Sequence, residues 1–279
     1  MSCPQMWLDK HRAPAWYNAP GIIMAFQPVR APDPLQAMYN MCGGQYRNVS
    51  TSLTVGVAPN WSPATGWAFT GSQYLWIWST GMGSLFQQAQ YTMIVRFSVT
   101  NAANRQFIIG DADAAASTYA TGIEVNGYAC DAEHIVSVQN NWTGAGSYTD
   151  SLTHAVANTL VTAAFTWTPG FKRSYIDGIY TNVNTASQTN TLAAGTHACF
   201  GRCGNYNGYY LTGRITAAAF YRRWMDDYEI RWICRQMAYC DVNPDWNVWA
   251  PQRRWFLPAR TVVPRQFITT LGVSRTVIE

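Results

Sequence analysis

Charge, and lysine above all, is scarce in this chain of 279 residues. Charged residues make up 12%, about half of the ~25% of an ordinary soluble protein. No run of about 18 apolar residues is present, so we expect no insertion into a membrane. Aromatic residues are abundant at 14%, with 13 Trp, 16 Tyr and 11 Phe. This combination excludes a disordered chain, a coiled coil and an acidic tail protein, and it predicts a globular protein.

Arginine carries almost all of the positive charge, because Lys10 and Lys172 are the two lysines. The net charge is +4, from 19 basic and 15 acidic residues. The planar guanidinium suits interfaces and stacking on rings, whereas an ammonium is a hydrated point charge. Nine arginines follow position 221: Arg222, Arg223, Arg231, Arg235, Arg253, Arg254, Arg260, Arg265 and Arg275. They alternate with Trp and Pro, which favours protein contacts and argues against nucleic acid as a partner.

The cysteines are seven in number, and the first residues show no secretory signal pattern. An odd number in this setting indicates mostly reduced thiols in a chain made in a cytoplasm. Cys199, Cys203, Cys234 and Cys240 invite comparison with a four-thiolate metal site, but their spacings do not fit one. We expect them to be small buried apolar residues. The four histidines are far apart, and we expect isolated loop or strand residues.

Short strands separated by Gly, Asn, Ser and Thr clusters run from about Val49 to Phe220. Thr92–Val99 and Arg105–Ala112 flank an Asn-rich turn, which predicts a hairpin. In HIVSVQ, Ile135 competes with the two valines for the inner face, so the register stays open. The pattern predicts an all-β protein, an antiparallel β-sandwich.

One helix is expected near Asp227–Tyr239, capped by Asp226 or Asp227 and ended before Pro244. Its apolar residues recur at helical spacing. Both ends of the chain differ from this middle. Residues 1–35 hold too many prolines for a strand or helix interior, and residues 241–279 mix prolines with aromatic residues and arginines. We therefore expect an N-terminal arm and lead-in over 1–44, a sandwich with its closing helix over 45–240, and a C-terminal arm over 241–279.

Several motifs together resemble the laminin-G-like, concanavalin A-like lectin/glucanase superfamily over roughly Phe26–Cys240. They are the strand openings GWAFTGSQYL and TMIVRFSV, a Y-x-D-G hairpin turn, and a final strand leading into the helix. Met225 stands where leucine is usual in this family, and Asp226 where Ser or Thr normally caps the helix. The residues that match the turn and the final piece are Tyr175, Asp177, Gly178, Gly213, Ile215, Tyr221, Arg223, Glu229 and Ile230. The resemblance implies a concanavalin A-like jelly roll.

The proline-containing lead-in and the tail NPDWNVWAPQRR are similar to forms found in tailed-bacteriophage virion proteins. This resemblance implies a virion-surface protein made in the host cytoplasm, a capsid decoration, head-fibre or tail adhesion protein. Its partners would be copies of itself as a homo-oligomer, or a capsid or tail protein. The residues expected to form the interface lie in the C-terminal arm: Trp246, Trp249, Arg253, Arg254, Trp255 and Phe256.

Catalysis is not expected. Glucanases of this superfamily use two glutamates on one strand, and no E-x-D-x-E occurs here. Glu124 and Glu133 would have to approach each other across a hairpin to act as a glycoside hydrolase, which we consider the weakest alternative. Asp226, Asp227 and Glu229 are better explained as helix capping. No cofactor is expected, although calcium at Asp111 and Asp113 is a possible exception, because loop carboxylates hold calcium in many relatives.

Glycan binding is the main alternative function, with host-surface glycans as the partner. Three segments combine rings with polar side chains: Gln73–Thr80, Gln139–Asp150 and Gly204–Tyr210. The candidate sugar-binding residues are Trp142, Tyr148, Asn205, Tyr206 and Tyr209. Trp76 in the first segment is equally well explained as a packing residue on a strand. The sequence thus predicts a non-enzymatic virion protein on a lectin-like sandwich, with a lectin or adhesin as the alternative.

Overall fold

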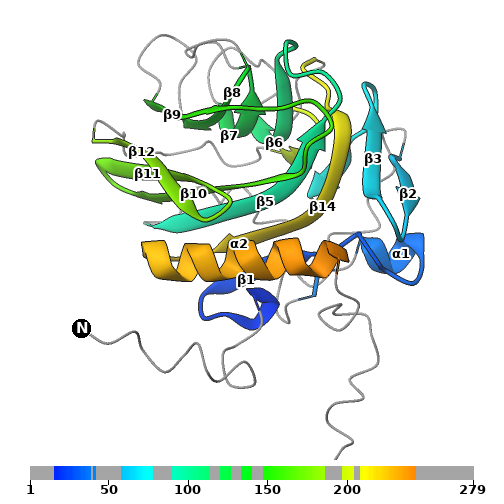
Figure 1. Ribbon diagram of the computed structural model, residues 1–279, viewed down its shortest axis with the longest axis horizontal. Helices are drawn as coiled ribbons and strands as arrows, with labels where there is room; N and C mark the ends of the chain where they lie inside the picture. The colour runs from blue at the N-terminus through cyan, green and yellow to red at the C-terminus, as the bar shows by residue number, and fades with distance from the viewer. Residues whose placement is uncertain are drawn as a thin grey trace, which may run out of the picture. The chain divides into compact units, whose positions relative to one another are not determined.

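The computed structural model describes residues 16–38, 40–41, 58–77, 90–112, 120–126, 133–139, 147–185, 197–203 and 208–242. All of them belong to the compact unit Met1–Val248. Two antiparallel sheets stack face to face, and one long helix packs on the outside of the larger sheet (Figure 1). The expected fold class, an all-β antiparallel sandwich with a C-terminal helix, is confirmed.

The larger sheet has eight strands in the order β12-β11-β10-β5-β14-β3-β2, and β1 also pairs with β14. The strands are β1 Ile22–Phe26, β2 Asn60–Ser62, β3 Gly66–Thr70, β5 Tyr91–Val99, β10 Val161–Thr168, β11 Phe171–Ile176, β12 Ile179–Asn184 and β14 Thr212–Tyr221. β5 is buried along nearly its whole length, because the second sheet covers one of its faces and the helix covers part of the other.

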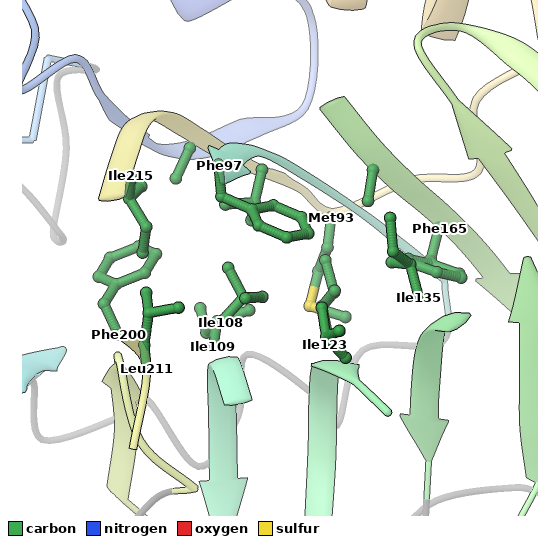
Figure 2. Packing of buried hydrophobic residues seen from close by; sticks show 14 of the residues in the cluster. Met93, Phe97, Ile108, Ile109, Ile123, Ile135, Phe165, Phe200, Leu211 and Ile215 are labelled. Atoms are coloured by element: carbon green, nitrogen blue, oxygen red, sulfur yellow. The ribbon is translucent and has the colours of Figure 1, made fainter. Parts of the chain in front are cut away.

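The smaller sheet has six strands in the order β4-β13-β6-β7-β8-β9. They are β4 Leu75–Ile77, β6 Gln106–Ala112, β7 Ala120–Val125, β8 His134–Gln139, β9 Ser147–His154 and β13 His197–Phe200. Figure 2 shows Met93 and Phe97 of β5 pointing toward Ile108, Ile109 and Ile123 of this sheet. Each fully buried side chain of this kind contributes about 1.5–3 kcal/mol. The inter-sheet core therefore dominates the stability of the sandwich.

Helix α2 runs over Asp227–Val242, three residues beyond the predicted end and still before Pro244. Asp226 caps it as expected, since its Oδ1 accepts hydrogen bonds from the backbone N of Tyr228 (2.9 Å) and of Glu229 (2.8 Å). Residues Ile230, Ile233 and Met237 pack onto the eight-stranded sheet, as their helical spacing predicted. The 3-10 helix η2, Trp16–Asn18, belongs to the same buried cluster through Trp16.

The predicted Y-x-D-G turn is confirmed, because Asp177 and Gly178 alone connect β11 to β12. Their φ angles are 51° and 78°, the left-handed pair that a type I′ hairpin requires. Asp177 Oδ1 also accepts a 2.8 Å hydrogen bond from the backbone N of Thr162 on β10. The turn is therefore tied to the sheet as well as to its own hairpin.

The predicted hairpin between Thr92–Val99 and Arg105–Ala112 is wrong. These segments are β5 and β6, and they belong to opposite sheets. The Asn-rich connection crosses the sandwich, and the Gln106 side chain holds it, because its Nε2 donates hydrogen bonds to the backbone carbonyl oxygens of Asn101 and of Asn104 (3.2 Å). Turn residues between two apolar runs do not distinguish a hairpin from such a crossing, because both need a chain reversal.

Two further expectations differ from the structure, and one open question is settled by it. Residues 1–35 were expected to hold no strand or helix interior, yet β1 lies between Pro20 and Pro28, and the short helix α1, Pro34–Ala37, follows. Ser147–His154 was not expected as a strand and forms β9. In β8, Ile135 enters the inter-sheet core, which settles the register that the sequence left open.

No helix in the described part of the chain is long and apolar enough to span a bilayer.

Candidate functional site

The outer face of the six-stranded sheet carries two arginine–aromatic clusters. On β4, Leu75 and Ile77 face the inter-sheet core, whereas Trp76 between them packs outside it. Cys199 on β13 pairs with Trp76 and lies in the same outer cluster. One register row crosses all six strands, and its successive Cα partners are Trp76, Cys199, Gly110, Gly122, Val138 and Tyr148.

Glycine is required in the middle of this row because backbone lies directly against it. A Cβ on Gly122 would lie 2.0 Å from the carbonyl oxygen of Ile109. A Cβ on Gly110 would lie 3.0 Å from the Cα of Cys203, which forms a parallel bridge with Gly110. The turn after β13 therefore crosses onto the outer face of β6, and it brings Arg202 there.

The first cluster, which we call the Arg202 cluster, consists of Tyr74, Trp76, Arg202 and Tyr210. The guanidinium carbon of Arg202 lies 3.7 Å from the ring centroid of Tyr74 and 4.9 Å from that of Trp76. Tyr210 is the third ring, at 6.0 Å. Arg202 is only 6% exposed, so these cation–π contacts form away from bulk water, where they are strongest. The rings thereby hold the guanidinium in one orientation.

The second cluster, the Arg105 cluster, consists of Arg105, Phe107, Glu124 and Tyr209. Arg105 Nε donates a 2.8 Å hydrogen bond to Glu124 Oε2. The guanidinium carbon lies 4.4 Å from the ring centroid of Tyr209 and 5.6 Å from that of Phe107. One residue thus forms both an ion pair and two ring contacts.

Glu124 is fully buried, and its Oε1 has no hydrogen-bond partner among the described residues. Burial raises the pKa of Glu124 to about 7, although the nearby positive charge of Arg105 opposes this. The desolvation of the charged form outweighs the ion pair here, because a single donor does not replace the lost hydration of both oxygens. The carboxyl group therefore keeps its proton to a higher pH than an exposed glutamate does.

Tyr209 and Tyr210 connect the two clusters, because these consecutive residues supply one ring to each arginine. The backbone carbonyl of Tyr209 accepts a 2.9 Å hydrogen bond from the N of Phe107, and Leu211 N donates one of 2.9 Å to Gly201 O. Tyr209 has a φ of 54°, which is unfavourable for a residue with a Cβ. Both rings are half-buried, so each keeps part of its surface in water. Strained backbone held in place by its surroundings is typical of functional sites.

The structure brings together two of the three segments expected to bind sugars. Tyr74 and Trp76 come from Gln73–Thr80, and Tyr209 and Tyr210 come from Gly204–Tyr210. Of the five candidate glycan residues, Tyr209 lies in the Arg105 cluster. Tyr148 belongs to strand β9 and not to a loop. Trp142, Asn205 and Tyr206 lie outside the described residues.

The remaining predicted sites lie partly or wholly outside the described residues. Asp111 is in β6, paired with Thr121 and Ala198, whereas Asp113 lies outside the described residues, so the calcium site stays a prediction. The expected interface residues of the C-terminal arm also lie outside the described part: Trp246, Trp249, Arg253, Arg254, Trp255 and Phe256.

The four cysteines whose spacings do not fit a metal site lie in two separate parts of the fold. Cys199 lies beside Tyr74 and Trp76 on the outer face of the smaller sheet. Cys234 and Cys240 pack between α2 and the larger sheet. All four, Cys203 included, are buried thiols, as expected for small apolar residues. The described residues contain no group of three or more His, Cys, Asp or Glu that fits a metal ion.

The hydrolase alternative placed Glu124 and Glu133 across a hairpin. The register sets Glu124 of β7 opposite Val136, whereas Glu133 precedes β8. The two glutamates are therefore not cross-strand partners. Sequence reasoning missed Arg105 and Arg202 as site residues. An arginine inside the ring-rich stretch CFGRCGNYNGYY was a signal for Arg202, but nothing near Arg105 indicated its partners.

No protein-family model matches this chain, and no curated protein matches it by sequence. Solved structures do match its fold. The binding domain of botulinum neurotoxin DC in complex with SialylT is 10% identical with a TM-score of 0.56, over 81% of this chain and 53% of that one. The receptor-binding domain of the botulinum neurotoxin C/D mosaic serotype is 10% identical with a TM-score of 0.53, over 77% and 51%. This chain therefore spans about half the length of these two structures.

Domain 4 of AbnA, a GH43 extracellular arabinanase from Geobacillus stearothermophilus, was solved in complex with arabinotriose. It is 12% identical to this chain with a TM-score of 0.51, and the match covers 76% of this chain and 98% of that one. Identities this low show the fold alone. The chain therefore shares the antiparallel β-sandwich fold of these three structures, and this agrees with the fold that the sequence resemblance implied.

Proposed function

We propose that this protein is a non-catalytic glycan-binding module and that its sugar site lies at the Arg202 and Arg105 clusters. The observation that carries the proposal is the pair of half-buried rings, Tyr209 and Tyr210, placed beside two arginines on the outer face of a lectin-like sandwich. Two structures with this fold, from AbnA and botulinum neurotoxin DC, were solved with ligands, arabinotriose and SialylT. That likeness supports the architecture, and the residues support the site.

The chemistry of the two clusters suits a sugar. An aromatic ring that is half in water offers a flat apolar surface for the C–H face of a pyranose. A guanidinium offers five N–H donors in a rigid fork for hydroxyl or carboxylate oxygens. Arg202 is held by three rings and Arg105 by a carboxylate, so little side-chain entropy would be lost when a ligand binds.

The roles of two described glutamates support a binding role without catalysis. Glu124 is paired with Arg105, and Glu229 is paired with Arg223 at the start of α2 through two 2.7 Å contacts. Retaining hydrolysis needs two carboxyl groups about 5 Å apart that flank the scissile bond. Glu124 and Glu133 do not form such a cross-strand pair, so we propose no hydrolysis.

The test is glycan-array binding of wild type against Tyr209→Asn. Asparagine tolerates the left-handed backbone at this position, so the substitution removes the ring without adding strain. We expect binding to be lost while the far-UV circular dichroism spectrum shows that the sandwich is still folded; the melting temperature falls, because the ring contact with Arg105 is lost. Tyr239→Ala is the matched control, because Tyr239 is a 53% exposed ring on α2, away from the six-stranded sheet. Equal binding by Tyr209→Asn and wild type would overturn the proposal, as would sugar release from a polysaccharide.

The bacteriophage role stays a second proposal, which the sequence supports through the resemblance of the lead-in and the tail. We propose a capsid decoration, head-fibre or tail adhesion protein on the virion surface, assembled with copies of itself or with a capsid or tail protein. A surface patch around Arg173 is consistent with protein contacts. Its guanidinium carbon lies 5.1–5.8 Å from the ring centroids of Phe171, Trp224 and Tyr180, a composition typical of interface hot spots.

The assembly proposal predicts that truncation after Val242, where α2 ends, leaves the sandwich folded but abolishes self-association. Sedimentation velocity of the full chain and of the truncated chain measures this directly. The expected result is an oligomer for the full chain and a monomer for the truncated chain. A full-length chain that sediments as a monomer would contradict the proposal.

A further inference from the structure

His134 and His154 contact each other across strands β8 and β9. Their Nε2 atoms are 3.2 Å apart, and their ring centroids are 4.3 Å apart. The sequence predicts isolated histidines, because 20 residues separate the two, and the structure differs. The register of the hairpin makes them direct partners.

The backbone explains why the two rings meet. His134 turns its carbonyl toward β7, where Asn126 N donates to it over 2.9 Å, and Ala155 N donates to Glu133 O over 2.8 Å. This pattern makes His134 and His154 a non-hydrogen-bonded pair, the type in which opposite side chains approach most closely.

A bulge in β9 places His154 at this position. From the pair Val136–Asp150 to the pair His134–His154, β8 advances by two residues whereas β9 advances by four. Leu152 within the bulge has a φ of 55°. Bulges commonly redirect side chains next to functional sites. His134 is buried, whereas His154 is exposed, so the pair can be reached from water.

The distance between the two Nε2 atoms matches the distance between two ligand nitrogens of a tetrahedral metal ion. Two nitrogens bound to zinc at about 2.0–2.1 Å with tetrahedral geometry lie about 3.3 Å apart. To bind the ion, the distance between the two ring centroids would have to increase to about 5 Å. The exposed ring of His154 can make this change by a rotation of its side chain. Imidazole nitrogen is a preferred ligand of zinc, copper and nickel ions.

We propose that His134 and His154 form a binding site for a divalent transition-metal ion, with water completing the coordination. The ion would replace the contact between the two imidazoles and would join the edge strand β9 to β8. Both rings must be neutral to donate their lone pairs, so acid weakens the binding. Because the ion binds the folded hairpin, it stabilises the native state by mass action.

The experiment is calorimetric titration of the full chain with Zn²⁺, repeated with Ni²⁺, on wild type and His154→Ala. His154 is exposed, so its removal should leave the fold intact, and the melting temperature without metal checks this. Loss of an outer-shell partner weakens metal affinity about tenfold or more. Loss of a direct ligand should weaken it at least as much. We therefore expect at least this weakening at one site, together with loss of the metal-induced rise in melting temperature.

His197→Ala is the control, because His197 belongs to β13 of the same sheet and is not a partner of the pair. It should bind the metal as wild type does. Imidazole signals in NMR spectra provide a second measurement that needs no variant, since the signals of the His134 and His154 rings should move together on addition of Zn²⁺. Equal affinity and equal stabilisation in wild type and His154→Ala would overturn the proposal, as would His134 signals that do not respond.

Discussion

Arg105 donates a 2.8 Å hydrogen bond from Nε to Oε2 of Glu124, and the carboxylate has no exposed surface. The pair joins the residue directly before β6 to the end of β7 on the outer face of the smaller sheet. Removing both charges from water costs more than their attraction returns, unless further hydrogen bonds compensate. The pair is therefore sensitive to pH, and that sensitivity can be measured.

We predict that Glu124 makes the protein less stable as the pH rises from about 4.5 to about 7. Burial raises its pKa in the folded state to about 7, whereas 4.5 is the ordinary value. Within this window the unfolded state has lost the proton that the folded state still holds. The free energy of unfolding then falls with increasing pH, by about 3 kcal/mol over the whole window, and levels off above it.

The measurement is urea unfolding at pH 5 and pH 8 for wild type and Glu124→Gln. The substitution removes the titration, so the loss of stability between the two pH values should be about 2.5 kcal/mol smaller in the variant. The same pH dependence in wild type and Glu124→Gln would show that Glu124 is already ionised at pH 5.

Gly178→Ala should destabilise the protein more than Gly170→Ala. Both glycines have a φ of 78°, so each substitution carries the same backbone strain. A Cβ on Gly170 meets nothing within 4 Å, whereas one on Gly178 would lie 2.7 Å from the Cα of Arg231 in α2. Forcing the helix away from the hairpin should cost about 1–3 kcal/mol more. Equal changes in the urea midpoint would mean that α2 does not press on this turn.

Asp226→Ala should cost about 1 kcal/mol of stability, because two backbone N–H groups at the start of α2 lose their acceptor. Asp226→Ser should recover most of this loss, since serine is an equally good N-cap and is usual at this place in the resembling family. Thermal unfolding of the three proteins checks the prediction. A serine variant no more stable than the alanine variant would assign the effect to the charge and the helix dipole.

Arg202→Lys should destabilise the outer face although it preserves the charge. An ammonium is strongly hydrated and does not stack flat on a ring, so the contacts with Tyr74 and Trp76 are lost. The expected loss is about 2 kcal/mol in the free energy of unfolding, the value for a desolvated cation–π contact. Arg222→Lys, an exposed arginine after β14, should cost far less. Similar losses in both variants would contradict the packing role of Arg202.

Local pattern was sufficient for the elements whose partners lie nearby in the chain. The Asp177–Gly178 turn, the helix cap at Asp226 and the apolar face of α2 all follow from interactions within a few residues. β9 escaped prediction because an edge strand with polar residues resembles a loop. The β5–β6 pair was assigned to one hairpin because both strands are apolar, and their separation into two sheets depends on partners far away in the chain.

By itself the sequence determined the class of the fold, the closing helix and two ring-rich segments of the candidate site. Composition and short-range periodicity express those features directly. Tertiary structure decided which side chains meet: Arg202 with Tyr74, Arg105 with Glu124, and His134 with His154. Such pairs depend on strand register, bulges and chain crossings. A shift of one residue moves every side chain of a strand to the other face, so these pairings arise only when the sheets assemble.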